Sequence, residues 1–160
     1  MADYPKRQKN EDEVRHANLL TTRRLLAAFS WVQPEVFPKL ISRDIVNRSP
    51  HPAGAIREED EVRLQHTAYP DLHYREEVAI AEGDMVFLGW EGTGTHLGPL
   101  YGKEATGVRV ELHGGEILRY SDGLVVEHFD HFTKPRLESL ALMDVLDDPV
   151  LNRLVEEGLL

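Results

Sequence analysis

Apolar residues recur at a mixed three- and four-residue spacing between Glu11 and Trp31, and this pattern predicts a long amphipathic helix. Pro34 limits that helix, and a shorter helical piece is predicted over residues 35–42. Residues 47–54 contain two prolines and a glycine, which are typical of a loop. A second long helix is predicted over residues 56–69, where an acidic first turn suits the positive end of the helix dipole.

The second half of the chain changes to the alternating pattern of strands. Two extended runs flank Glu82-Gly83-Asp84, and two more flank Ser121-Asp122-Gly123, so each glycine can supply the positive φ of a tight hairpin turn. Gly114-Gly115, inside the third run, indicates a β-bulge that would curve the sheet. Helices followed by a four-stranded antiparallel meander predict an α+β domain, in which a curved sheet around a helix forms a cone with a pocket inside.

Length and charge narrow the class of protein. The chain of 160 residues is the size of one domain, 1–160, with a flexible N-terminus at 1–10 and a helical extension at 133–160. The net charge of −10 argues against a nucleic-acid partner, which requires a basic face. No apolar run approaches a membrane span, and the first residues lack the apolar core of a signal peptide, so we expect a cytoplasmic protein.

The last predicted strand carries ionisable residues among apolar ones. Because side chains on a strand alternate, Val126, His128, Asp130 and Phe132 are expected to share one face, and His131 the other. In an apolar pocket, burial disfavours the charged form of a carboxyl group and a nearby imidazolium favours it. A carboxyl group tuned in this way can exchange a proton near neutral pH. Alternatively, this face points to solvent, or the acid and the imidazole pair only for structure.

A second candidate site is the row Trp90, Gly92, Gly94 and His96, which the same alternation places on one strand face. The two glycines would leave space for a flat ligand above the sheet, and His96 could polarise a carbonyl at the end of the row. Alternatively, the glycines mark a bend and His96 is an ordinary residue at a strand end.

Other chemistries find little support in the sequence. The 8 histidines include no H-E-x-x-H spacing, and a His96–His128–Asp130 cluster is feasible only if their strands adjoin. There is no cysteine, no nucleophile elbow and no phosphate-binding loop with its lysine. We therefore expect neither a metal nor an organic cofactor.

Several short motifs follow one another from Tyr69 to Phe132. They are YPDL after a helix, AEGD at a hairpin, GTHLG ending a strand, TG opening the next, and RYSDGLVVEHFD closing the meander. In this order they resemble the SnoaL-like polyketide cyclases, of the superfamily of ketosteroid isomerase and nuclear transport factor 2. The resemblance implies a cystatin-like, cone-shaped α+β barrel that dimerises through its sheet. It also implies aldol ring closure of polyketide esters without metal or organic cofactor.

The resemblance assigns roles to particular residues. The family's acid/base aspartate follows an aromatic residue, and Asp130 after Phe129 occupies that place. His96 matches the histidine of GTH, and Asn47 matches a pocket residue in the loop after the short helices. The chain departs from the family at Leu124, where a basic residue is usual.

Three hypotheses follow. In the first, the protein is a cofactor-independent cyclase or isomerase of hydrophobic carbonyl compounds, with Asp130 as acid/base and His96 as its partner. In the second, an epoxide hydrolase or dehydratase, Asp130 activates water with Asn47 and Arg119. In the third, the cone only binds a hydrophobic ligand, or its sheet only forms a dimer. The residues expected to bind substrate are Trp90, His128, Asn47, Arg119, Tyr120 and Phe132.

Overall fold

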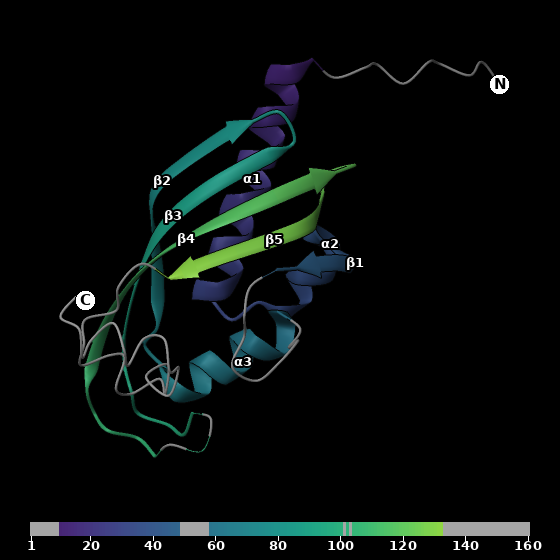
Figure 1. Cartoon of the computed structure of the whole chain (residues 1–160). Coiled ribbons are helices and arrows are strands. Elements are labelled where there is room, and N and C mark those ends of the chain that lie inside the picture. Colours follow the sequence, from purple (N-terminus) through teal and green to yellow (C-terminus); the bar gives the residue numbers. More distant parts are fainter. Residues whose placement is uncertain (1–9, 49–57, 101, 103, 133–160) are drawn as a thin grey trace, which may run out of the picture.

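The computed structural model describes residues 10–48, 58–100, 102 and 104–132, with only the backbone described for Glu58 and residues 130–132 (Figure 1). The predicted flexible N-terminus, apart from Asn10, and the predicted C-terminal helices lie outside these ranges. The elements, in chain order, are α1 (Glu11–Ser30), a 3₁₀ turn η1 (Pro34–Val36), α2 (Phe37–Leu40), β1 (Ile41–Asn47), α3 (Glu58–Ala68), β2 (His73–Glu82), β3 (Met85–Thr95), β4 (Arg109–Ser121) and β5 (Leu124–Phe132).

The structure confirms both predicted long helices, the first from its apolar spacing and the second from its acidic first turn. α1 begins with a capping box, in which the Asn10 side chain accepts from the Glu13 amide and the Glu13 carboxylate accepts from the Asn10 amide. It ends before Pro34, and α3 ends just before Pro70. No helix in the described parts of the chain is both long and apolar enough to cross a membrane.

The strands form one sheet in the order β1-β5-β4-β3-β2. The predicted meander is β2 to β5, and each of its neighbouring pairs is antiparallel. β1 was not predicted: it continues directly from α2 and pairs parallel with β5. Its largely exposed sequence has no clear strand pattern of its own. The strand is held in place instead by its pairing with β5, about 80 residues later in the chain, which the local sequence does not reveal.

The hairpin turns match their sequence signals. Gly83 has a φ of 55°, and Asp122 and Gly123 have φ of 51° and 82°. These left-handed conformations are the ones that Gly and Asp tolerate best, so the register of both hairpins is fixed locally.

The bulge predicted at Gly114-Gly115 is wrong. β4 pairs with β3 without a register shift at these residues, where Trp90 lies opposite Gly114. The glycines make room for aromatic rings instead: a Cβ on Gly114 would lie 2.3 Å from the Trp90 ring, and one on Gly115 would lie 3.0 Å from the ring of Phe87. The register shifts occur in the pairings of β2, of β1, and of β4 with β5.

The inner face of the curved sheet packs against the helices. Figure 1 shows α1 along one face of the sheet, with α3 on the same side. Alternate strand residues pointing inward join the helices in two buried groups, which bury much of the apolar surface of the described domain. The first contains Leu25, Ala28, Phe37, Leu40, Val62, Val86, Leu118, Tyr120 and Val125, and the second contains Ala68, Tyr69, Leu72, Leu88, Trp90, Leu100, Val110 and Leu112.

Candidate functional site

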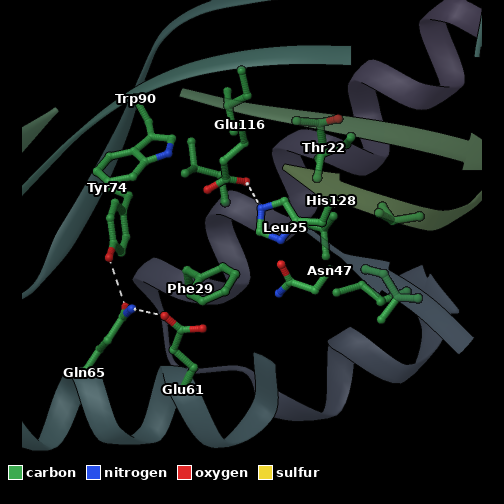
Figure 2. A pocket seen from close by; sticks show the side chains of 16 residues that line it. Thr22, Leu25, Phe29, Asn47, Glu61, Gln65, Tyr74, Trp90, Glu116 and His128 are labelled. Atoms are coloured by element: carbon green, nitrogen blue, oxygen red, sulfur yellow. Dashed lines mark hydrogen bonds and ion pairs between the residues drawn. The ribbon is translucent and has the colours of Figure 1, made fainter. Parts of the chain in front are cut away.

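A pocket opens between the inner face of the sheet and helices α1 and α3 (Figure 2). Its cavity volume is about 70 Å³, and the pocket also opens to solvent. The apolar part of its lining consists of Leu25, Leu26, Phe29, Ile41, Ile45, Leu88, Trp90, Leu118 and Val125. The polar part consists of Thr22, Asn47, Glu61, Gln65, Tyr74, Glu116 and His128. An apolar cleft with a few convergent polar groups is the usual form of a small-molecule site.

An acid and an imidazole meet on the sheet side of this pocket. The His128 Nε2 atom lies 3.6 Å from a carboxylate oxygen of Glu116, with side chains 18 % and 23 % exposed. Strand pairing produces this contact, because His128 lies opposite Leu118 and position 130 lies opposite Glu116. Asn47 reaches the same place from β1, where it pairs with His128. Neighbouring strands therefore bring a carboxylate, an imidazole and an amide together.

Aromatic rings form another part of the wall. Tyr74 meets Trp90 edge-to-face at a centroid distance of 5.1 Å, and Phe29 meets Tyr74 in the same way at 6.3 Å. Trp90 is 3 % exposed, and Gly114 beneath it leaves room for the indole. Edge-to-face contacts hold the rings in fixed orientations, so this part of the wall is apolar and preformed.

A second polar group lies on the helix side. The Tyr74 hydroxyl donates to the Gln65 carbonyl oxygen at 2.9 Å, and the Gln65 amide donates to the Glu61 carboxylate at 2.9 Å. Figure 2 shows this chain on a different wall from Glu116 and His128.

The same fold and motifs occur in known proteins. A family model described as SnoaL-like polyketide cyclase matches residues 20–138. The chain belongs to the SnoaL-like polyketide cyclase family. This confirms the resemblance found in the sequence, and the open, mostly antiparallel sheet with its helices fits the cone-shaped α+β fold of these proteins.

Solved structures support the assignment. AclR from Streptomyces galilaeus, described as a candidate hydroxylase, is 32 % identical over 81 % of this chain and 98 % of its own, with a TM-score of 0.67. IdmH from Streptomyces antibioticus, described as a candidate polyketide cyclase, is 25 % identical over 72 % of this chain and 91 % of its own, with a TM-score of 0.62. A SnoaL-like protein from Jannaschia sp. CCS1 shares the fold at 20 % identity, covering 89 % of this chain and 99 % of its own, with a TM-score of 0.67. None of the curated proteins compared with the chain matches it.

Three of the predicted binding residues of this SnoaL-like chain line the pocket: Trp90, His128 and Asn47. For Asp130 and Phe132 the structure gives the backbone pairing, opposite Glu116 and Gly114, while their side chains lie outside the described atoms. One detail of the predicted face is wrong. The shift in register between β4 and β5 puts Val125 on the pocket lining with His128, in place of Val126.

His96 lies elsewhere in the fold. It is fully buried beyond the end of β3, its Nδ1 atom 3.1 Å from the Thr106 hydroxyl and its ring 5.2 Å from that of Tyr69. β4 separates β3 from β5, and the positions on β4 that face Thr95 and His128 are nine residues apart. At about 3.3 Å a residue, that is roughly 30 Å along the strand. The structure does not bring His96 to His128.

The space above the glycines near His96 is filled by the protein. A Cβ on Gly92 would lie 2.9 Å from the Tyr74 ring, and one on Gly94 would lie 3.3 Å from Leu72 and Tyr69. The expectation that a flat ligand occupies this space is therefore wrong. Gly92 and Gly94 instead permit Tyr74, Leu72 and Tyr69 to pack closely against β3.

Arg119 and Tyr120 do not line the pocket. Arg119 donates to Glu127 at 2.9 Å and to Asp84 at 3.1 Å, away from the pocket. Hydrogen bonds from Arg48 and then Arg119 lower the pKa of the Glu127 carboxyl. The Tyr120 hydroxyl lies 2.7 Å from that of Thr22, which does line the pocket. Burial raises the pKa of Tyr120 to about 12, so this phenol stays protonated as a support for the wall.

Sequence reasoning missed most of the polar lining. Glu116 had a visible signal, because it is the acid in the otherwise apolar or glycine row of Leu112, Gly114, Leu118 and Tyr120. Glu61 and Gln65 occur in a helix rich in polar residues and had no such signal. Within the described ranges, no three His, Asp or Glu side chains are arranged to hold a metal ion.

Proposed function

We propose that this SnoaL-like protein is an enzyme that moves a proton at a carbon beside a carbonyl group of a hydrophobic small molecule, closing a ring or isomerising it. The observation that carries the proposal is the Glu116–His128 contact inside an apolar, aromatic pocket. The family match and the similarity to IdmH, described as a candidate polyketide cyclase, support ring closure as the reaction.

Asp130 is the proposed acid/base. It occupies the family's acid position, and its backbone lies opposite Glu116 and two residues beyond His128. In the reaction, the Asp130 carboxylate takes the proton from carbon, and the resulting enolate carbon attacks a second carbonyl to form the carbon–carbon bond. The proton then returns to the new alkoxide oxygen. His128 and the Asn47 amide are the proposed donors to the developing oxyanion.

Asp130→Asn tests this role. We expect turnover of an aromatic polyketide ester to fall about 10²- to 10⁴-fold, with a normal circular dichroism spectrum. Asp44→Asn, at an exposed position on β1, is the matched control and retains activity. Near-normal turnover by Asp130→Asn would show that another group moves the proton.

We also propose that the reaction uses neither a metal nor an organic cofactor, as the family resemblance implies. The proposal predicts that dialysis against EDTA leaves turnover unchanged. Loss of activity on chelation, restored by one divalent metal, would contradict it.

AclR favours a second candidate function. Its 32 % identity and its description as a candidate hydroxylase point to hydroxylation of a small molecule, in which O₂ supplies the inserted oxygen atom and a two-electron reductant, the substrate itself or a second compound, reduces the other oxygen atom to water. Labelled oxygen distinguishes the reactions: ring closure incorporates no label, hydroxylation incorporates ¹⁸O from O₂, and hydrolysis incorporates it from water. Hydrolysis by Asp130, Asn47 and Arg119 is less favoured, because Arg119 lies away from the pocket.

The outer face of the sheet is the proposed homodimer surface. Strand pairing aligns Ile80, Phe87, Ile117 and Phe129 in one row across β2 to β5. The first three are 60 %, 40 % and 37 % exposed. Contiguous apolar surface of this kind typically marks an interface, and a second copy of this chain is the proposed occupant because the family resemblance implies dimerisation through the sheet.

A further inference from the structure

Two of the motifs that carry the family resemblance, YPDL and GTHLG, lie against each other in the structure. The Asp71 carboxylate accepts hydrogen bonds from the Thr95 amide at 2.6 Å and from the Thr95 hydroxyl at 2.8 Å. The buried rings of Tyr69 and His96 lie 5.2 Å apart. A polar contact and an aromatic contact therefore join the turn after α3 to the end of β3.

The same region holds the last turn of α3. The Ala68 carbonyl oxygen accepts from the Leu97 amide at 2.9 Å and from the Gly98 amide at 3.0 Å. Carbonyl oxygens at the end of a helix have no partner within the helix, so these two amides satisfy a group that is buried here. Gly98 allows the approach, because a Cβ at this position would lie 2.1 Å from the Thr67 carbonyl oxygen, closer than non-bonded atoms come.

The β3 side of this contact is held in turn by the chain leading into β4. The His96 amide donates to the Val108 carbonyl oxygen at 2.9 Å, and the Gly107 amide donates to the His96 carbonyl oxygen at 2.8 Å. The His96 Nδ1 atom lies 3.1 Å from the Thr106 hydroxyl. The residues that join α3 to this support form the α3 clamp: Ala68, Tyr69, Asp71, Thr95, His96, Leu97 and Gly98.

Two other contacts hold α3 against the rest of the domain. Val62 is fully buried in the first core group, and the His66 Nε2 atom lies 2.6 Å from the Phe29 carbonyl oxygen of α1. These contacts keep α3 packed on the core, whereas the backbone bonds of the α3 clamp fix where its last turn lies relative to the sheet.

α3 carries one wall of the pocket on the turns that precede the α3 clamp. Glu61 and Gln65 line the pocket, and Glu61 precedes Ala68 by about two helical turns, or about 10 Å. A rotation of α3 by about 10° at the clamp would therefore move Glu61 by roughly 2 Å. Figure 2 shows both lining residues on a different wall from Glu116 and His128. Such a movement changes the width of the pocket and leaves the acid and the imidazole in place.

We infer that the α3 clamp positions the substrate indirectly, by setting the distance between the α3 wall and the sheet wall of the pocket. The inference rests on the proposed function of the pocket and adds to it residues outside the lining that determine how well the substrate fits. These are positioning residues, which act through α3 and take no part in the proton transfer. His96 thereby has a role in the fold that does not require it to touch a carbonyl group.

Kinetics of variants on the two sides of the clamp test the inference. Asp71→Ala removes both bonds that the carboxylate accepts, and Gly98→Ala forces a methyl group against α3. Each is expected to raise KM for the aromatic polyketide ester about three- to tenfold, with kcat within about twofold of wild type, because only the fit of the substrate changes. Asp84→Ala is the matched control: it removes a carboxylate bond of 3.1 Å to Arg119, away from α3, and leaves KM unchanged.

Hydrogen–deuterium exchange reports on α3 without turnover. A weakened clamp should speed amide exchange in α3 and leave exchange in α1 unchanged in the same sample. Thr95→Val removes the hydroxyl donor and keeps the amide, so it should show part of the change in KM and in exchange. Thr95→Ser keeps both donors and should behave as wild type. Circular dichroism confirms that each variant is folded, and Asp71→Ala with Thr95→Val carries the test if Gly98→Ala does not fold.

A raised KM with faster exchange in α3, found in Asp71→Ala and absent from Asp84→Ala and Thr95→Ser, supports the inference. An unchanged KM, a fall in kcat alone, or equally faster exchange in α1 and α3 overturns it and leaves the proposed function standing. Absence of turnover by the wild type overturns the proposed function and, with it, the positioning role; this result is distinct because it is seen before any variant is compared.

Discussion

Gly114→Ala is the sharpest test of how the pocket wall is built. A Cβ at this position would lie 2.3 Å, 2.6 Å and 2.8 Å from the Cζ2, Cε2 and Cη2 atoms of Trp90. Carbon atoms in contact are normally about 3.5–4.0 Å apart, so the indole has to move by more than about 1 Å. The backbone of β4 blocks movement of the indole toward the sheet. The ring of Tyr74, whose centroid lies 5.1 Å from that of Trp90, limits movement along the wall. The indole is therefore pushed toward the pocket.

The cost is that of an overpacked core, about 1–3 kcal/mol of the free energy of unfolding. For a chain of this size, 1 kcal/mol corresponds to about 2–4 °C, so we expect the melting temperature to fall by about 3–10 °C. Thermal denaturation followed by circular dichroism measures this. The near-ultraviolet circular dichroism of the indole reports the change in the wall.

Gly115→Ala is a matched control on the opposite face of the same strand. Its Cβ would meet the ring of Phe87 at 3.0 Å, but that ring is 40 % exposed and can turn aside. In both variants alanine reduces the backbone freedom of the unfolded chain by the same amount, so the difference between their losses of stability isolates the effect of the clash. Equal losses of stability in the two variants would refute the reasoning. The double variant Gly114→Ala, Trp90→Phe should lose less than the sum of the single changes, because phenylalanine lacks the clashing part of the indole.

Further predictions concern pH, the wall and the dimer. Hydrogen bonds from the Thr95 amide and then from its hydroxyl lower the pKa of the Asp71 carboxyl. The stability that these bonds contribute is therefore present above the unfolded-state pKa, near 3.9, and is lost as the pH falls through the lower pKa of the folded state. Melts from pH 7 to pH 2 should show a shallower loss for Asp71→Asn than for wild type, and parallel curves would contradict this. Tyr120→Phe should cost about 0.5–1.5 kcal/mol by removing the bond to Thr22, measured by urea denaturation; an unchanged midpoint would contradict the support role. Phe87→Asp should shift the proposed dimer to a monomer in analytical ultracentrifugation with unchanged circular dichroism, and an unchanged mass would exclude this face as the interface.

The local parts of the fold could be predicted because their signals are local. The cap and spacing of α1 and the glycine turns at Gly83 and Gly123 depend on residues a few positions apart. β1 could not be predicted, because its partner β5 is remote and its own sequence is polar. The Gly114-Gly115 pair shows the limit of a composition rule: small residues signal close approach, but the sequence does not say whether backbone or an aromatic ring approaches.

The pocket was predicted only along single strands. Alternation predicted which residues share a strand face with Trp90 and with His128, and the structure shows that both residues line the pocket. The contact between His128 and Glu116 depends on strand register, which alternation within one strand does not determine. The expected contact of His96 with the residues of β5 is absent for the same reason. Alternation along β3 and β5 does not reveal that β4 lies between these strands or how far apart the two positions are.

The parallel pairing of β1 with β5 has a consequence for the order in which the molecule can assemble. Asn47 meets His128 only after 81 further residues have been made and the whole meander between them has formed. Closing so long a loop is entropically costly, and such contacts form late in folding. A chain emerging from the ribosome therefore contains most of its buried apolar residues before β5 joins the sheet, and β5 then completes both the apolar core, through Val125, and the polar centre. Binding of a pocket ligand would then report that the last strand has joined the sheet.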